Sequence, residues 1–453
     1  MSDIYNHGVA FRPDSLEKVS YDLNQLESKY SYVRIYWVDL ANVRRCRVVP
    51  LSYFKQLLAS NRPGVNIAKV GLGLIYLITS PGFSSIGEYV YVPDIATLRP
   101  LPFTDDHLGV LGTFEEKTPY KRSDGSSSLQ VELCPRTALK KVVEDAKKSS
   151  NVDFLVGFES EFILLSSTNP VKPSNDHQWS APGGFLAGSK EAAILQEIGN
   201  AMQTSGLSLQ MIHSEAAPGQ YEVVVNVASK HGLHATFAPR PFMTSAGSAA
   251  HVHISVHSGN EPTKPVEEMS KAESAFLAGV IEHLPALPAI TLPTPASYKR
   301  VADGVWSGGT YVHYGTENRE APIRLTNATS PKSRNFEMRF VDGTANPYLA
   351  LAAIIGAGVT GLKAKKPLDV KDCPGPLCAW QMTEEERQAL GITRRMPLNV
   401  EEARNYLVAD AGMKEILGVE MVEKYLSVSK TLEGALLQEQ DEAEQLTRLV
   451  EFY

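Results

Sequence analysis

The sequence predicts an α+β protein in which a small N-terminal α+β unit precedes a larger domain with an antiparallel sheet flanked by helices. Short strand-like runs are interleaved with helical stretches without an internal repeat, which favours this class over a regular βαβ fold. A proline-rich segment, 93–105, predicts a linker between the two parts. The final stretch from about residue 400 is mostly helical in pattern. A chain of 453 residues is long enough for one large and one small domain.

The N-terminal unit is expected to span 14–105, after a loose tail at 1–13. Apolar residues recur at helical spacing from Leu16 to Tyr30, and Asp14 with Glu17 matches a capping box, so a helix is predicted there. Strands are predicted to follow at 32–40, around 67–78 and at 88–93.

The larger domain is expected to span 106–453, opening with a strand at 107–114 and a helix at 135–149 that begins at Pro135. The uncharged run 345–362 is barely long enough to cross a membrane, and its Ala and Gly content favours a buried helix. Within it, GAGVTG (356–361) matches GxGxxG but follows a helical run rather than a strand. Helix termination or close helix packing therefore explains these glycines better than dinucleotide binding.

Composition narrows the class of protein. Hydrophobic content of 43% and charged content of 21% are typical of soluble globular chains. A formal charge of −7 argues against a nucleic-acid binder. The four cysteines fit neither a zinc spacing nor a disulfide framework, and the N-terminus has no signal pattern, so a cytoplasmic location is expected.

The stretch GFESEFILL (157–165) places two glutamates in a run that otherwise looks like a buried strand. Side chains two residues apart on a strand share a face, so Glu159 and Glu161 lie side by side. Two neighbouring carboxylates repel each other and lose hydration when buried. Either this face of the strand is solvated, or a cation compensates the pair.

The stretch HSEAAPGQYE (213–222) predicts a hairpin, because Pro218 and Gly219 fit the central positions of a type II turn. Counting back from that turn places Glu215 opposite Glu222. Facing glutamates are unfavourable unless a cation lies between them.

Two further strands offer groups of the same kind. SAAHVHISV (248–256) places His251 and His253 on one strand face, and RNFEMRFVDG (334–343) does the same for Glu337 and Arg339. Oxygen-rich ligand sets suit Mg²⁺ or Mn²⁺ and the phosphates that these ions carry. Basic residues gather in 299–339 and suit anionic groups, although a solvated basic face remains an alternative. They are Lys299, Arg300, Arg319, Arg324, Lys332, Arg334 and Arg339. No GxxxxGK[ST] occurs, so a nucleotide would need a site unlike the P-loop.

These motifs carry a resemblance. GFESEF, HSEAAPGQYE, SAAHVHIS, PTPASYKR, GTENREAPIR and NFEMRFVDGTANPYLALAA occur in the order seen in the glutamine synthetase family. The match runs from about Tyr32 to the C-terminus, and 306–322 looks closest to glutamine-synthetase-like domains of fungal proteins and to γ-glutamyl-amine ligases. The resemblance implies an N-terminal β-grasp domain, a catalytic domain with a curved antiparallel sheet (the glutamine synthetase/guanido kinase-like fold), and a ring-shaped homo-oligomer.

The resemblance also implies roles for single residues. One divalent ion (Mg²⁺ or Mn²⁺) would be held by Glu161, Glu215 and Glu222, and a second by Glu159, His251 and Glu337. His253 and Ser255 would lie along the ATP, and Arg319, Arg324 and Lys332 would steady the transferred phosphoryl group. Glutamate would be positioned by Gly247, Arg300 and Arg339.

The activity implied is ATP-dependent ligation of L-glutamate with ammonia or an amine through a γ-glutamyl phosphate. The alternative is a non-catalytic relative with a regulatory or structural role. Two departures from the family pattern bear on this choice. The segment between Glu222 and His251 is shorter than in the family by about twenty residues, and Trp306 stands where ammonia-using members carry a glutamate. An aromatic acceptor site suits an organic amine better than ammonium.

Overall fold

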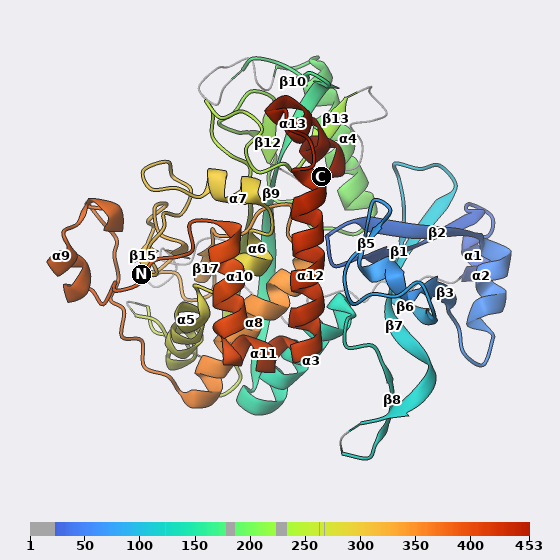
Figure 1. The fold of residues 1–453 in the computed structure, drawn as a ribbon, viewed down its shortest axis with the longest axis horizontal. Helices are drawn as coiled ribbons and strands as arrows, with labels where there is room; N and C mark the ends of the chain where they lie inside the picture. Colours follow the sequence, from blue (N-terminus) through green and yellow to red (C-terminus); the bar gives the residue numbers. More distant parts are fainter. Residues whose placement is uncertain (1–22, 123, 178–185, 223–232, 262, 267) are drawn as a thin grey trace.

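The computed structural model describes residues 23–122, 124–177, 186–222, 233–261, 263–266 and 268–453. It confirms the α+β class: a smaller sheet lies to one side of the molecule, and a larger sheet with most of the helices lies on the other (Figure 1). Buried apolar residues from Val33 to Val450 form one cluster that reaches from the smaller sheet into the helical part. The two parts therefore share a continuous core.

The smaller sheet has the β-grasp arrangement. A hairpin, β1–β2, leads into helix α2 (Leu51–Leu58), and a second hairpin, β6–β7, returns so that β7 lies parallel to β1 at the centre. The order is β2-β1-β7-β6-β3, with β8 added beside β7. Its strands are β1 (Tyr32–Val38), β2 (Arg44–Pro50), β3 (Val65–Ala68), β6 (Glu88–Pro100), β7 (His107–Lys121) and β8 (Ser127–Gln130).

Two predictions for this region are wrong. Residues 93–105 are not a linker, because β6 continues to Pro100 and its backbone pairs with β7. The strand predicted at 107–114 to open the larger domain is the beginning of β7, a central strand of the smaller sheet. The boundary placed at residue 105 therefore cuts through this sheet. Tyr89, Val90 and Tyr91 are all buried, and backbone pairing with β7 holds β6 extended despite the strand-breaking tendency of its prolines.

The other N-terminal elements match in part. The strand at 32–40 is confirmed as β1, and the helix predicted from Asp14 overlaps α1 (Leu23–Leu26), while the capping box and the tail lie outside the described residues. The stretch 67–78 is broken into the end of β3, a 3₁₀ turn η3 (Lys69–Leu72) and the short hairpin β4 (Leu74–Ile75) and β5 (Ile78–Thr79).

The larger sheet is antiparallel except for the pair β15–β16. Its order is β11-β12-β9-β14-β17-β16-β15, and β10 and β13 also pair with the long central strand β9. The strands are β9 (Val152–Thr168), β10 (Val171–Pro173), β11 (His213–Ser214), β12 (Gln220–Glu222), β13 (His234–Thr236), β14 (Ala250–Ser258), β15 (Tyr314–Thr316), β16 (Ile323–Thr326) and β17 (Asn335–Met338).

Helices surround this sheet (Figure 1). The predicted helix at 135–149 is confirmed as α3, with Pro135 in its first turn, and the C-terminal stretch is helical as expected. The helices are α3 (Pro135–Ser150), α4 (Lys190–Thr204), α5 (Lys271–His283), α6 (Pro288–Thr291), α7 (Pro295–Arg300), α8 (Pro347–Ala364), η6 (Ala379–Gln381), α9 (Glu384–Ala389), α10 (Val400–Ala409), α11 (Ala411–Leu417), α12 (Val419–Leu436) and α13 (Glu442–Phe452).

Helix α8 contains the uncharged run and the GxGxxG match. By length and composition alone, this helix could cross a membrane. However, 67% of its 18-residue apolar window is buried inside the protein. The prediction of a buried helix is confirmed. A Cβ on Gly361 would lie 2.1 Å from the carbonyl oxygen of Ala275, so this glycine lets α5 approach closely. Close helix packing thus explains the glycines.

The turn at 39–43 ties the smaller sheet to the segment that follows β17. Asn346, the N-cap of α8, donates its side-chain amide to the carbonyl of Asp39, and Asn42 donates to the carbonyl of Gly343. The hydroxyl of Tyr453 donates to the carbonyl of Ala41. These bonds hold the smaller sheet against the segment 343–346, which follows β17, and against the C-terminal residue.

Candidate active site

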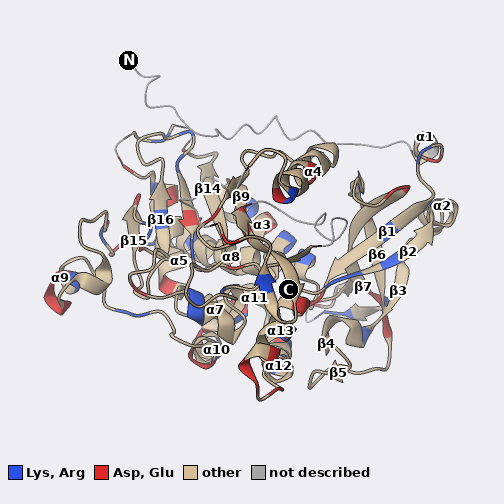
Figure 2. Ribbon diagram, turned by 90° about the horizontal axis from the view of Figure 1, so that it is seen from above, with Lys and Arg blue, Asp and Glu red and all other residues tan. Residues whose placement is uncertain are grey.

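The acids and histidines singled out in the sequence lie on strands that are neighbours in the larger sheet. Glu222 on β12 pairs with Glu161 on β9, and His251 on β14 pairs with Glu159. His253 and Arg324 flank Glu337 from the two adjacent strands. Figure 2 shows acidic positions in the part of the sheet that contains β9, β14 and β16; β17 lies between β14 and β16. Fixed backbone pairing thus brings side chains distant in sequence into one cluster, which we call the carboxylate cage.

One end of the cage is formed by Glu159, His253 and Glu337, whose candidate ligand atoms lie within 4.8 Å of one another. His253 Nε2 is 2.9 Å from a carboxylate oxygen of Glu159. His251 lies beside them, its Nδ1 3.4 Å from oxygens of both Glu159 and Glu337. The structure therefore brings together the set expected from the resemblance and adds His253 to it.

The other end is formed by His213, Glu215 and Glu222, again within 4.8 Å of one another. The type II turn is confirmed: Gln220 N donates to Ala217 O over 3.1 Å, and Gly219 has φ +68°. The predicted register is wrong, because Glu222 pairs with His213 and not with Glu215. Gln220 closes the turn on Ala217 and also accepts a hydrogen bond from Glu215 N (2.8 Å), so Ala216 and Ala217 are extra residues on one side and shift the register by two.

Glu161 lies between the two ends and is buried. Its Oε2 accepts hydrogen bonds from Gln220 Nε2 (2.9 Å) and Ala249 N (3.1 Å), and its Oε1 is 4.0 Å from His251 Nδ1. Burial raises the pKa of Glu161 to about 8, and the charge of Glu215 adds to the increase. The strand face is thus not solvated at this residue, and the metal-free site favours a proton there.

The pKa values of neighbouring groups in the cage are shifted in opposite directions. Burial would raise the pKa of Glu159, but the imidazoles of His251 and His253 outweigh it and hold the pKa below its ordinary value. Burial raises the pKa of Glu222 to about 7, with a further contribution from the charge of Glu159. Burial lowers the pKa of His251 to about 4, so this imidazole is neutral at pH 7. A neutral imidazole between carboxylates is a ready metal ligand.

The residues fit divalent cations. Each end of the cage offers two carboxylates and an imidazole, and His251 Nε2 is buried without a hydrogen-bond partner among the described residues. A buried, unsatisfied ring nitrogen is costly unless a further group binds it. Carboxylate oxygens with imidazole suit Mn²⁺, and the oxygens suit Mg²⁺.

Two arginines line the cage. Arg339 contacts Glu337 through Nη1 and donates Nε to Arg319 O (3.1 Å) and Nη2 to Trp306 O (2.8 Å). Arg324 Nη1 donates to Glu337 over 3.0 Å, and its Nη2 contacts Glu317. Both guanidinium groups are therefore held in place beside the acids, as forked donors for an anionic substrate require.

The other predicted residues lie around this centre. Arg300 is buried and donates Nη2 to the carbonyls of Arg339 and Val341. Gly247 packs against it, since a Cβ there would lie 2.4 Å from Arg300 Cγ. Arg319 and Lys332 are exposed, and of these two described residues only Arg319 has an interaction with a cage residue, through its charge on Glu215.

Two residues are engaged elsewhere. Ser255 shares a hydrogen bond of 2.7 Å with His257 on the same strand. The guanidinium of Arg334 is buried against Glu273 and several backbone carbonyls, so this member of the basic segment supports the fold.

Sequence reasoning missed three residues at the site. His213 lies two residues before Glu215, and this HxE spacing on a strand could have revealed it. Gln220 gives no signal in the sequence, because it reaches the site through a hydrogen bond to Glu161 on β9. Asn335, which lies 2.8 Å from His253 Nδ1, gives no signal of its own.

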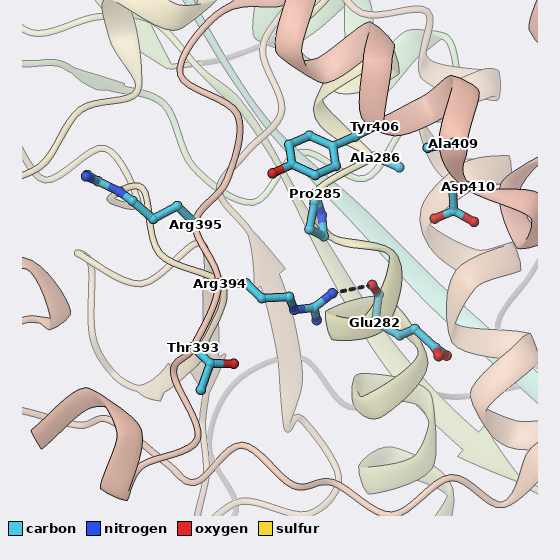
Figure 3. Close-up of a pocket in the computed structure, with 9 residues that line it drawn as sticks. All are labelled: Glu282, Pro285, Ala286, Thr393, Arg394, Arg395, Tyr406, Ala409 and Asp410. Carbon is cyan, nitrogen blue, oxygen red and sulfur yellow. Dashed lines mark hydrogen bonds between the residues drawn. The ribbon is translucent and has the colours of Figure 1, made fainter. Parts of the chain in front are cut away.

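A cavity of about 490 Å³ lies away from the cage, between the end of α5 and helix α10 (Figure 3). Its charged groups already have partners: Arg394 donates to the carbonyls of Glu282 and Ile281, and Asp410 is 2.8 Å from His283. The cage, with its unsatisfied and mutually repelling groups, is the stronger candidate for chemistry.

The fold resembles solved structures along nearly the whole chain. A structure titled "GmaS/ADP complex-Conformation 1" superposes with a TM-score of 0.73 at 23% identity, covering 95% of this chain and 99% of that one. At this identity the likeness establishes the fold.

Relatives are found by sequence as well. Protein fluG of Emericella nidulans is 34% identical over 450 residues, covering 93% of this chain and 49% of fluG, so the chain spans about half of that relative's length. A glutamine synthetase of Methanocaldococcus jannaschii is 32% identical over 388 residues, covering 77% of this chain and 80% of that enzyme. A γ-glutamylpolyamine synthetase, GlnA3 of Streptomyces coelicolor, is 30% identical over 329 residues, covering 65% of this chain and 68% of that enzyme.

The family model for the glutamine synthetase catalytic domain matches residues 132–226 and 222–448. The break between the two segments falls where the sequence is expected to be shorter than the family. The matched segments cover most of the chain and include all the strands that build the cage. The chain therefore belongs to the glutamine synthetase family.

Proposed function

We propose that the protein is an ATP-dependent ligase that joins L-glutamate to ammonia or an amine through a γ-glutamyl phosphate. The observation that carries this proposal is the carboxylate cage, which places acids and imidazoles from adjacent strands beside two fixed arginines. Members of the glutamine synthetase family, to which the chain belongs, generally use ATP and a divalent metal. Relatives named glutamine synthetase and γ-glutamylpolyamine synthetase support the same class of reaction.

Two Mg²⁺ or Mn²⁺ ions would be held at the two ends of the cage. Glu159, His251, His253 and Glu337 would hold one, and Glu161, His213, Glu215 and Glu222 would hold the other. When bound, the ions neutralise the acids and the phosphate charge that develops during phosphoryl transfer. The repulsion between Glu159 and Glu161 is then compensated.

The proposed ligation has two steps. A γ-carboxylate oxygen of glutamate attacks the terminal phosphorus of ATP and ADP leaves; the amine nitrogen then attacks the acyl carbon, phosphate leaves and a proton is lost. Arg339 and Arg300 would position the glutamate, and Arg319, Arg324 and Lys332 would steady the phosphoryl group, because such transfers depend mainly on positioning and on stabilising charge.

The direct experiment measures ADP release from magnesium-loaded protein with glutamate and a panel of ammonia, organic amines and hydroxylamine. Glu337→Gln should abolish amine-stimulated turnover. Glu317→Gln is the matched control, because Glu317 contacts the same Arg324 but is exposed and outside the cage. Folded wild-type protein that shows no amine-stimulated turnover would rule out the ligase.

A non-catalytic relative is the second candidate. The break in the family match at residues 222–226 favours it, because a segment next to the cage strand β12 differs from the family there. Nucleotide binding separates the two candidates. A ligase binds ATP with Mg²⁺, whereas a protein with a purely structural role shows no ATP-induced stabilisation.

A further inference from the structure

Gln220 lies at the contact between the carboxylate cage and the segment 247–249. It belongs to β12 and its side chain is only 2% exposed. Its Nε2 lies within hydrogen-bond distance of three oxygens, namely Glu161 Oε2 (2.9 Å), Gly247 O (3.1 Å) and Ser248 Oγ (3.1 Å). An amide NH₂ group has two hydrogens, so the three acceptors compete for them. A change at one acceptor therefore alters the bonds to the other two.

The amide of Gln220 is held in one orientation by the turn that precedes it. Its Oε1 accepts a hydrogen bond from Ala217 N (2.8 Å), and its backbone carbonyl accepts one from Glu215 N (2.8 Å). Backbone pairing with β9 fixes the same residue, with Gln220 opposite Ile163. The NH₂ group is therefore directed at Glu161 and the segment 247–249 by bonds made elsewhere in the residue.

On the cage side, the amide fixes the carboxylate of Glu161. Gln220 Nε2 and Ala249 N both donate to its Oε2. The other oxygen, Oε1, lies 4.0 Å from His251 Nδ1. Glu161 is therefore held with one oxygen bonded to the protein and the other directed towards the cage.

On the other side, the amide fixes the backbone of Gly247, which packs on Arg300. A Cβ on Gly247 would lie 2.4 Å from Arg300 Cγ and 2.6 Å from the carbonyl oxygen of Pro239, so this backbone is enclosed on both sides. Arg300, which is proposed to position glutamate, is itself only 3% exposed. The buried amide of Gln220 thus connects a proposed metal ligand with the proposed glutamate site.

We infer that Gln220 is a positioning residue that couples metal binding at Glu161 to glutamate binding at Gly247 and Arg300, so that each ligand tightens the binding of the other. This inference rests on the proposed ligase function and adds how its two sites are linked. When Glu161 is fixed by a bound cation, the amide and the Gly247 carbonyl are also fixed before glutamate arrives. Less ordering then remains for glutamate binding, so its affinity rises. Glutamate must raise the metal affinity by the same factor.

The test measures the dissociation constant of glutamate by calorimetry, with and without saturating Mn²⁺ and in the absence of nucleotide. The ratio of the two constants is the coupling factor. In the wild type we expect a factor of about five or more, as is typical of coupled sites. Gln220→Met removes the amide but keeps an unbranched side chain of similar length, and we expect its factor to be about fivefold smaller, the effect of one lost hydrogen bond.

Two further variants separate the amide contact from general damage to the site. Ser248→Ala is the matched control, because it removes one acceptor and leaves the bonds of Gln220 to Glu161 and Gly247, so the coupling factor should stay at its wild-type value. Gln220→Glu keeps an acceptor for Ala217 N and removes the NH₂ group, so it should lose coupling as Gln220→Met does. If Gln220→Met does not fold, Gln220→Glu decides by the same criterion.

The outcomes separate this inference from the function it rests on. Amine-stimulated ADP release by the wild type, together with an unchanged coupling factor in Gln220→Met, would overturn the inference and leave the ligase intact. A lower Tm of the variant with an unchanged factor would also overturn it, since Gln220 would then only support the fold. Glutamate that binds neither with nor without Mn²⁺, together with no turnover, would remove both proposals.

Discussion

Glu161→Gln should stabilise the metal-free protein at pH 8, although it removes a carboxylate from the cage. The pKa of Glu161 is raised from 4.5 to about 8, so the folded protein retains a proton that the unfolded chain releases above about pH 4.5. Stability is therefore lost as pH rises from about 5 to 8. At 1.36 kcal/mol per pKa unit, this one carboxyl destabilises the metal-free protein by roughly 4 kcal/mol at pH 8.

Glutamine avoids this destabilisation and keeps the local structure. Both hydrogen bonds that Glu161 accepts, from Gln220 and from Ala249, end on the same oxygen, Oε2. An amide oxygen can accept both, while its NH₂ group faces the neighbouring acids. With an unfolding entropy of about 2.1 cal/mol/K per residue, roughly 4 kcal/mol corresponds to a Tm increase of about 4 °C for a chain of 453 residues.

The assay is thermal unfolding in EDTA at pH 5 and pH 8, followed by titration with Mn²⁺ or Mg²⁺. The increase should shrink at pH 5, where Glu161 is protonated in the wild type, and the metal-induced gain in Tm should be smaller in the variant. Glu159→Gln is the matched control on the same strand: the pKa of Glu159 is lowered, so its charge is stabilising and its removal should lower Tm at pH 8. Equal destabilisation by Glu161→Gln at both pH values would refute the reasoning.

Three further predictions concern metal choice, substrate use and the core. His213→Ala should weaken Mn²⁺ binding about tenfold or more and Mg²⁺ binding less, because imidazole is the softer ligand. Calorimetric titration of the apo protein measures both affinities, and an unchanged affinity for Mn²⁺ would exclude His213 as a ligand. Arg339→Lys should raise KM for glutamate at least about tenfold, since one ammonium cannot replace the three directed contacts that orient the guanidinium, to Glu337, Arg319 O and Trp306 O. An unchanged KM would contradict the assignment. Gly361→Ala should destabilise the fold by about 1–3 kcal/mol, because its Cβ would meet the carbonyl of Ala275; denaturant unfolding measures this, and a neutral effect would show that α5 and α8 can separate.

Much of the cage could be predicted from the sequence because strand periodicity is a local property. The alternation in GFESEF and HVHIS places each pair of side chains on one face whatever the partner strand is. What local pattern could not supply is which strands are neighbours. That β12, β9, β14 and β17 lie in this order depends on crossovers and helix packing, and the expectation of a shared site came from the repeated residue types and from the family resemblance.

The wrong predictions also arise from contacts between segments that are distant in sequence. The register of the 213–222 hairpin depends on the turn geometry and on the pairing of Glu222 with β9, neither of which the ten residues contain. Prolines break strands and therefore favour a linker at 93–105, but Pro93 and Pro100 both lie within β6, where the paired neighbour β7 holds the chain extended. The sequence groups Arg334 with the site arginines because its buried partner, Glu273, is distant in sequence and leaves no local signal.

Because hydrogen bonds join the turn at 39–43 to residues 343–346, the larger domain should not be stable when it is separated from the smaller sheet. Cutting the chain between them would strip partners from the amide of Asn346 and the carbonyl of Gly343, at the start of α8 and just beyond the strand that carries Glu337. It would also open the shared core to water. Chimaeric proteins that exchange segments with a relative should therefore replace residues 39–43 and 343–346 together.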